Sequence, residues 1–173
     1  FEIGLRSFNI MSIYSGFFNY KVIQPIDLLI SRTLVAVALQ LIVLIIILQS
    51  IFFIKGEMTL ENIPLLFLSL FSLTLFSFGL GIIFMIMGYK NKFLSEKVIP
   101  IFFRPIFLLS GTIISLYNIP QNLHKFFTWN PILQANEISR NALTENYILY
   151  DGISFSYLFL VSFLFFFYWD NIL

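Results

Sequence analysis

The feature that most constrains this chain is the length of its uncharged stretches. No charged residue occurs from Thr33 to Ile54, and a second uncharged stretch runs from Ile63 to Met87. A helix needs about 20 mostly apolar residues to cross the hydrocarbon core of a bilayer. Only 11% of the residues are charged, whereas a soluble domain carries about 25%. We therefore read the chain as an integral membrane protein.

The apolar stretches predict an all-α fold, a polytopic bundle of membrane helices in one transmembrane domain. Within residues 1–173 we expect spans at 33–54, 63–88, 98–117 and 152–169, and an external hairpin at 118–151. Ser77 and Gly81 lie four residues apart in the second span. Such small-residue pairs let two helix backbones approach closely, so we expect a helix contact there.

Basic residues are shared unevenly between the two sets of loops. One set carries Arg6, Lys21, Arg32, Lys90, Lys92, Lys97 and Arg104, whereas the other carries Lys55, Lys125 and Arg140. Cytoplasmic loops of membrane proteins hold the excess of Lys and Arg. We therefore expect the first set in the cytoplasm and the 55–63 turn and the hairpin outside.

Residues 1–32 are interrupted too often by polar side chains to form a complete span. Ile10, Ile13, Tyr14 and Phe17 recur at helical spacing, which is typical of an amphipathic helix at a membrane surface. A helix that docks on a soluble partner and a plain interfacial linker are both compatible with these residues.

The third expected span contains an unusual dipeptide, Arg104-Pro105, followed by Ser110-Gly111. Pro105 removes a backbone hydrogen bond and tends to kink the helix. Because an arginine is unfavourable at the bilayer centre, we expect Arg104 either to reach back to the near interface or to face the bundle.

After that span the chain turns polar and carries helix signals. Trp129 suits a membrane interface. Asn130-Pro131 is a helix start, with Asn as N-cap and Pro at the first helical position. Glu137 and Arg140 then stand at i,i+3 and can pair. On a surface this pair contributes little, but inside a membrane it becomes a fixed buried element.

The residue inventory excludes several classes of function. The chain has no cysteine and one histidine, so disulfides, thiol catalysis and a histidine-based metal cluster are excluded. It lacks a G-x-x-x-x-G-K-[ST] phosphate loop and the H-E-x-x-H and G-x-S-x-G signatures. No Asp or Glu lies inside the four spans, which argues against a proton relay. We expect no cofactor and no metal.

Three pieces of the chain, in order, resemble the permease subunit of polysaccharide ABC exporters. This is the ABC type-2 transporter family, and the resemblance is closest to its capsular polysaccharide branch. Residues 18–32 resemble the cytoplasmic run that ends the coupling region of the family. Arg104-Pro105 with Ser110-Gly111 resembles its fifth helix, and Trp129-Asn130-Pro131 with Glu137, Arg140 and Tyr147 resembles its outer hairpin. By this resemblance the chain is truncated at its N-terminus, with Phe1 to Arg6 as the tail of a second span.

The resemblance implies a permease homodimer with two ATP-binding cassette subunits, as a multi-pass protein of the inner (cytoplasmic) membrane. Its cargo would be capsular or related polysaccharide or glycolipid. The protein would contact membrane lipids and would not bind nucleic acid. ATP hydrolysis would take place on the separate subunit. The coupling helix would use Arg6, Ile10, Ile13, Tyr14 and Phe17. Sugar rings would slide past aromatic side chains at the outer mouth, with Tyr117, Phe126, Phe127 and Trp129 as candidates.

Three other functions remain open on the sequence. A permease of the same architecture could move another cargo, such as O-antigen, teichoic acid or a drug. A membrane-embedded enzyme of glycan or lipid assembly would need acids or histidine at a membrane face, and Glu137 with His124 is the only nearby set. The third is a structural or assembly protein of the membrane.

Overall fold

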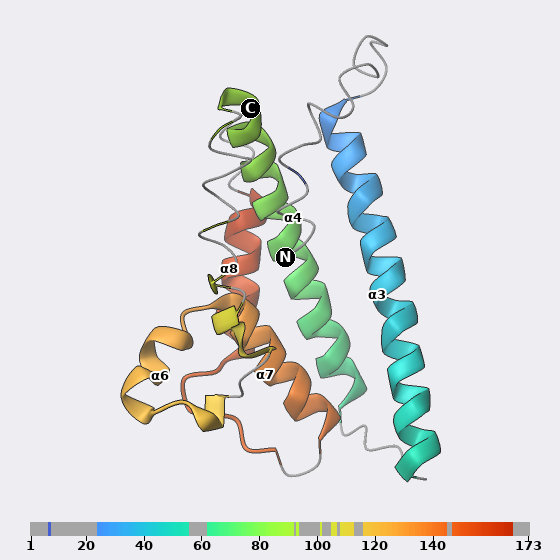
Figure 1. Cartoon of the computed structure of the whole chain (residues 1–173), viewed down its shortest axis with the longest axis vertical. Coiled ribbons are helices and arrows are strands. Elements are labelled where there is room, and N and C mark those ends of the chain that lie inside the picture. The colour runs from blue at the N-terminus through green and yellow to red at the C-terminus, as the bar shows by residue number, and fades with distance from the viewer. Residues whose placement is uncertain are drawn as a thin grey trace.

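The computed structural model describes residues 7, 24–55, 62–91, 93, 101, 105–106, 108–112, 116–144 and 147–167. All the elements that these residues form are helical (Figure 1): α3 (Pro25–Lys55), α4 (Ile63–Lys90), η3 (Leu108–Thr112), η4 (Leu116–Asn118), α6 (Gln121–Phe127), α7 (Pro131–Leu143) and α8 (Phe155–Phe167). The expected all-α bundle is confirmed.

Helix α3 begins well before the uncharged stretch inside it. Pro25 occupies its first position, and the Asp27 carboxylate accepts a hydrogen bond from the Gln24 N–H over 2.9 Å, which closes the first turn. The expected span began at Thr33. That limit was set by Arg32, the last charged residue before the apolar stretch. A charge limits where a helix can enter the hydrocarbon core, but it does not limit where the helix itself begins.

Helix α4 follows the expected bounds closely. The Asn62 side chain accepts a hydrogen bond from the Leu65 N–H over 3.2 Å, and a proline stands in the first turn. The helix continues past Gly88 to Lys90, since one glycine weakens a helix by only about 1 kcal/mol. Segments Pro25–Ile54 and Ile63–Gly88 are the two described helices that are long and apolar enough to cross a membrane.

The third expected span is irregular in the described residues, whereas the fourth contains a regular helix. Gly111, inside 98–117, has φ 75°, a left-handed conformation that a right-handed helix cannot contain. Helical geometry therefore breaks there, and a short 3-10 turn, η4, follows. Helix α8 has 13 residues, a length of about 20 Å. Residues 168–169 of that span lie outside the described part of the chain.

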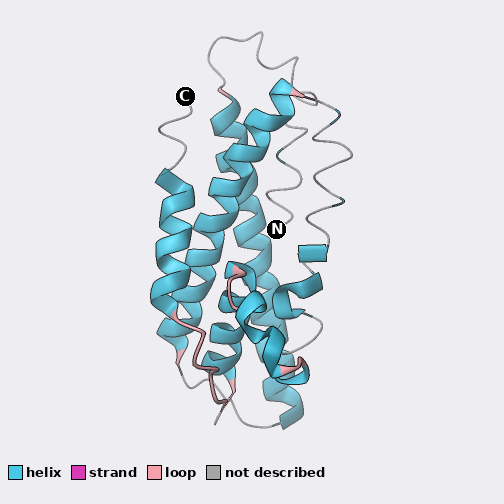
Figure 2. Ribbon diagram, turned by 90° about the vertical axis from the view of Figure 1, so that its left-hand side faces the viewer, coloured by secondary structure: helices cyan, strands magenta, loops and turns pink. Residues whose placement is uncertain are grey.

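Helix α4 is the centre of the bundle, and Figures 1 and 2 show α8, α7 and α3 arranged around it. A Cβ on Gly79 would lie 2.6 Å from the Phe165 carbonyl oxygen, so the backbones of α4 and α8 touch there. A Cβ on Gly81 would lie 3.0 Å from Ser7 Oγ and 3.1 Å from Leu29 Cδ1, so side chains rather than a second backbone lie against this glycine. The closest approach nevertheless falls at Gly79, which the sequence did not single out.

Helix α7 lies beside the first half of α4 rather than beyond its end (Figure 1). The Asn62 N–H donates to the Ala142 carbonyl over 3.3 Å, and the hydroxyl oxygens of Ser69 and Ser139 are 2.9 Å apart. Apolar residues of both helices share one core: Leu65, Leu73, Leu133, Ala135 and Ile138. The hairpin, expected to be external, therefore packs its second helix along a membrane span, because that helix has an apolar face to bury.

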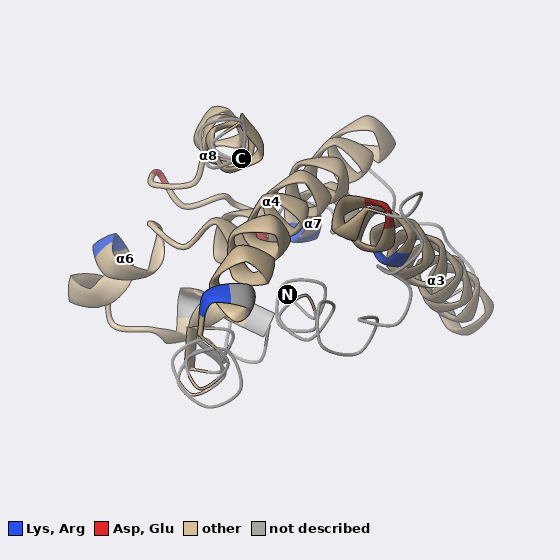
Figure 3. Cartoon of the chain, turned by 90° about the horizontal axis from the view of Figure 1, so that it is seen from above, with Lys and Arg blue, Asp and Glu red and all other residues tan. Residues whose placement is uncertain are grey.

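Only a small part of the surface of helix α3 is in contact with the other described helices. Within an 18-residue apolar stretch of α3 no residue is buried, compared with 44% of such a stretch in α4. Its exposed side chains are large and apolar, as at Leu34, Leu39 and Ile46. Figure 3 shows charged residues only near the ends of α3 and α4. The free sides of α3 are therefore suited to lipid or to another apolar protein surface.

Candidate functional site: a polar clasp beside an aromatic groove

The start of α7 agrees with the sequence. The Asn130 Oδ1 accepts a hydrogen bond from the Ile132 N–H over 3.0 Å, and Pro131 is the first helical residue. Asn130 also has a role that the cap signature did not predict. Its Nδ2 donates to the Ile106 carbonyl over 3.2 Å, which ties the helix start to the segment before η3.

The predicted pair of Glu137 and Arg140 is confirmed. Arg140 Nη1 lies 2.6 Å from Glu137 Oε1. The hydroxyl of Tyr147 donates to Glu137 Oε2. Glu137 is only 2% exposed, so the pair is a buried element rather than a surface one. Both carboxylate oxygens are engaged.

The clasp reaches the break in the third expected span. Arg140 Nη2 donates to the Gly111 carbonyl over 2.5 Å, and Asn136 Nδ2 donates to the Ser110 carbonyl over 2.9 Å. A broken helix leaves carbonyls without helical partners, and these side chains supply the missing donors. The Ser110-Gly111 motif and the pair of Glu137 and Arg140, which the sequence showed as separate features, are thus joined by hydrogen bonds. We call Ser110, Gly111, Asn136, Glu137, Arg140 and Tyr147 the polar clasp.

Gln134 is a structural residue that sequence reasoning missed. It is 1% exposed, and its Nε2 donates to the carbonyls of Thr128 (2.8 Å) and Gly152 (2.9 Å). Its Oε1 accepts from the Ser154 N–H over 2.9 Å. The available signal was its position three residues before Glu137, a second polar group on the same helix face. Gln134 therefore links the segment before α7 to the segment before α8.

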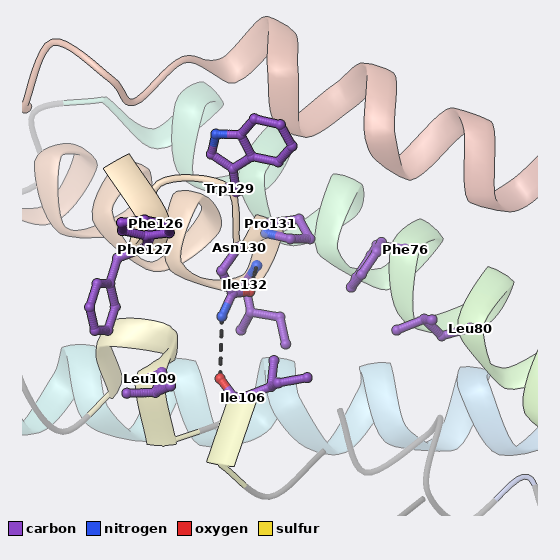
Figure 4. A pocket seen from close by; sticks show the side chains of 10 residues that line it. All are labelled: Phe76, Leu80, Ile106, Leu109, Phe126, Phe127, Trp129, Asn130, Pro131 and Ile132. Atoms are coloured by element: carbon purple, nitrogen blue, oxygen red, sulfur yellow. Dashed lines mark hydrogen bonds between the residues drawn. The ribbon is translucent and has the colours of Figure 1, made fainter. Parts of the chain in front are cut away.

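Three of the four predicted mouth residues line one groove of about 350 Å³ (Figure 4). Phe126 and Phe127 come from α6 and Trp129 from the link to α7. Phe76 and Leu80 of α4, Ile106 and Leu109 of the third expected span, and residues 130–132 at the start of α7 also line it. Phe126 is 78% exposed and Trp129 79%. We call this site the aromatic groove.

The backbone of Trp129 is held from α8. The Tyr157 hydroxyl donates to the Trp129 carbonyl over 2.8 Å. Tyr117, the fourth predicted mouth residue, is the second residue of η4, and its side chain lies outside the described part of the structure. Pro105 is exposed. Six further candidates lie outside the described residues and stay predictions: Arg6, Ile10, Ile13, Tyr14, Phe17 and Arg104.

A second cavity, of about 290 Å³, brings His124 and Glu137 together. His124 Nε2 lies 2.7 Å from the Ile119 carbonyl, and its ring meets Tyr150 edge to face at 4.6 Å. Because both Glu137 oxygens are already engaged, the carboxylate is not free for acid-base work, which disfavours the enzyme hypothesis. Within the described ranges, no group of three or more His, Cys, Asp or Glu could hold a metal ion.

Comparison with known proteins identifies the family. The family model described as ABC-2 type transporter matches residues 1–144. Two Escherichia coli proteins, each named polysialic acid transport protein KpsM, are 31% identical to the chain over 157 residues. The match covers 91% of this chain and 60% of each relative, so the chain spans less than two thirds of their length. The resemblance to polysaccharide-export permeases is confirmed, and the chain belongs to the ABC-2 type transporter family of integral membrane proteins.

Proposed function

We propose that the chain is part of the channel subunit of an exporter that moves capsular or related cell-surface polysaccharide across the inner membrane. Its similarity to two proteins named for polysialic acid transport supports this cargo class. The observation that carries the proposal is the pair of exposed aromatic side chains, Phe126 and Trp129, on a hairpin fixed to the membrane helices. An exposed aromatic face gives a sugar ring a stacking surface without demanding one sequence of sugars.

The α6–α7 hairpin acts in this proposal as the outer gate. The polar clasp ties α7 to Gly111, and Gln134 ties it to the start of α8. A displacement of the third expected span would therefore move the hairpin with it. The start of α4 lies beside the end of α7, since the Asn62 N–H donates to the Ala142 carbonyl. We place this end outside, following the distribution of basic residues.

Energy in this proposal comes from a separate subunit. The sequence has no phosphate-binding loop, so ATP hydrolysis is assigned to two ATP-binding cassette partners, and the permease itself is not an enzyme. The amphipathic stretch with Ile13 and Tyr14 is the proposed docking helix. A homodimer is supported by the uncovered apolar sides of α3, whose remaining surface would contact membrane lipids.

Deletion and complementation of the gene in its host test the cargo. With the gene deleted, we expect the capsular polymer to disappear from the surface and accumulate in the cytoplasm, and the full-length gene to restore export. Loss of O-antigen, teichoic acid or drug resistance instead, with the capsule intact, would keep the family and reject the polysaccharide assignment.

Affinity purification of the full-length protein tests the partner. We expect an ATP-binding cassette subunit to co-purify, and the variant Tyr14→Ala to lose it. Phe53→Ala is the matched control, because Phe53 is 92% exposed at the far end of α3 and should retain the partner. Equal recovery of the subunit with both variants would reject the docking helix.

A further inference from the structure

We propose that the second cavity, between α6, α7 and the segment before α8, binds one uncharged sugar unit of the exported chain through its hydroxyl groups. The inference rests on the export function proposed above. It adds a preference that this function does not imply, since a neutral sugar is favoured over an acidic one. The polar groups around the cavity and the charge at its opening carry the inference.

The cavity, of about 290 Å³, is lined by polar side chains that are not used elsewhere. Gln121, Tyr150 and Asp151 line it, and within the described ranges none of their side chains has a hydrogen-bond or ion-pair partner. They offer an amide, a phenol and a carboxylate. A sugar hydroxyl both donates and accepts, so this mixed set suits it. Ligand pockets have volumes of about 300–1,000 Å³, so this cavity fits a small ligand such as a single sugar ring.

His124 is the buried member of the lining, with 6% of its surface exposed. Its Nε2 lies 2.7 Å from the Ile119 carbonyl oxygen, which only accepts, so Nε2 carries a hydrogen. In the neutral ring Nδ1 is then an acceptor, and this buried atom has no hydrogen-bond partner in the described part of the chain. Buried polar atoms nearly always have a partner. A hydroxyl group of a bound sugar would supply the missing donor.

The walls of the cavity are fixed by contacts within the protein. The Ile153 N–H donates to the Tyr150 carbonyl over 2.9 Å, which closes the turn before α8. Gln134 Nε2 holds the same turn through the Gly152 carbonyl, also over 2.9 Å. The rings of Tyr150 and His124 meet edge to face, with their centroids 4.6 Å apart. Groups that are already ordered lose little entropy when a ligand binds, so a few hydrogen bonds are enough to hold one sugar ring.

The charge at the opening sets the preference for a neutral sugar. Glu137 and Asp151 both line the cavity. The Glu137 carboxylate is compensated by Arg140 at 2.6 Å. Asp151 is exposed and has no ion-pair partner among the described residues. An acidic sugar would bring a further carboxylate close to Asp151, and like charges repel. The hydroxyl groups of a neutral sugar donate to that carboxylate instead.

Saturation-transfer NMR on the full-length protein in lipid nanodiscs tests the inference. The two probes are methyl β-glucoside and methyl β-glucuronide, which differ only in the hydroxymethyl group or carboxylate at C6. At low ionic strength, where charge repulsion is least screened, we expect several-fold stronger transfer to the glucoside. Asp151→Asn keeps the shape and removes the charge, so it should bring the two signals close together. Asp27→Asn, at an exposed acid in the first turn of α3, is the matched control and should leave the ratio unchanged.

A second variant tests the buried end of the cavity. His124→Phe keeps an aromatic ring and removes both nitrogens, so transfer to both probes should fall several-fold. The Asp151→Asn comparison stands even if His124→Phe does not fold, because Asp151 is exposed. No transfer to the glucoside, as for a cavity that holds only water, would overturn the proposal. Equal transfer to both probes, or a ratio that Asp151→Asn leaves unchanged, would overturn it too.

These outcomes are separate from the fate of the export proposal. Export is judged by surface polysaccharide after deletion of the gene, and none of the NMR results changes that reading. Surface polysaccharide that persists in the deletion strain would reject the export function, while a measured preference for the glucoside would still assign a neutral-sugar site to this cavity.

Discussion

Arg140 donates a hydrogen bond over 2.5 Å to the carbonyl of Gly111, which lies 29 residues earlier in the chain. Gly111 is the point at which the third expected span leaves right-handed helical geometry. The same guanidinium holds Glu137 at 2.6 Å. One side chain thus connects the broken span to the hairpin and compensates a buried carboxylate.

Removing the cation of the polar clasp should destabilise the protein more than removing the whole ion pair. Breaking one side of a buried pair costs about 3–5 kcal/mol. Because Arg140 is 31% exposed, we expect Arg140→Met to fall at the lower end of this range, about 3 kcal/mol. The double variant Glu137→Gln/Arg140→Met should lose clearly less than the sum of the two single variants. Denaturant unfolding in detergent measures the cycle, and strict additivity would contradict the coupling.

The loss of stability on replacing Gly111 should depend on how well the new residue adopts a left-handed backbone conformation, and not on side-chain size alone. A left-handed conformation costs an ordinary L-residue about 1–2 kcal/mol, while asparagine tolerates it better. We therefore expect Gly111→Val to reduce stability by more than that amount, since its side chain would also crowd Leu133. Gly111→Asn should be milder. Equal thermal midpoints for the two variants would show that the positive φ is unimportant.

The two glycines on α4 should differ in their tolerance of alanine. At Gly79 the new Cβ would lie 2.6 Å from a backbone oxygen of α8, which cannot move without separating the helices. At Gly81 it meets side-chain atoms of Ser7 and Leu29 at 3.0 and 3.1 Å, which can adjust. We expect a loss of about 1–3 kcal/mol for Gly79→Ala and a smaller change for Gly81→Ala. Thermal unfolding of both variants measures the two losses, and a larger loss for Gly81→Ala than for Gly79→Ala would contradict this packing.

Gln134 should be important for stability without touching the aromatic groove. Gln134→Leu leaves two carbonyls and the Ser154 N–H without their partner. Each unsatisfied buried group costs about 1–3 kcal/mol. We expect lower stability together with faster amide exchange at Ser154. Gln121→Leu, at an exposed position of α6, is the control and should stay within about 0.5 kcal/mol.

The sequence predicted those features whose causes are local. The Asn130 cap, the proline that follows it and the i,i+3 pair of Glu137 and Arg140 each depend on a few consecutive residues. The second span was placed well because its polar turn and its uncharged stretch are both local signals. These features are the ones in which expectation and structure agree.

The features that the sequence did not predict depend on partners far along the chain. Nothing near Arg140 indicates that its second nitrogen meets Gly111, and nothing near Gly79 indicates that α8 passes there. Gln134 was missed partly for the same reason, since Gly152 and Ser154 lie 18 and 20 residues later in the chain, although Thr128 lies only six residues earlier. The hairpin was placed outside from the distribution of basic residues, a signal that carries no information on the packing of the apolar face of α7 against α4.

Export of polysaccharide by a Trp129 variant is the decisive measurement. The full-length protein carrying Trp129→Ala and Tyr117→Ala is expressed with its ATPase partner in cells that lack the wild-type gene. The gate assignment predicts that surface polysaccharide falls at least several-fold and that polymer accumulates in the cytoplasm, while protein level and ATPase binding are unchanged. Phe53→Ala, an exposed aromatic residue away from the groove, should export normally. Unchanged export by the double variant at a normal protein level would contradict the assignment of the aromatic groove to the outer gate.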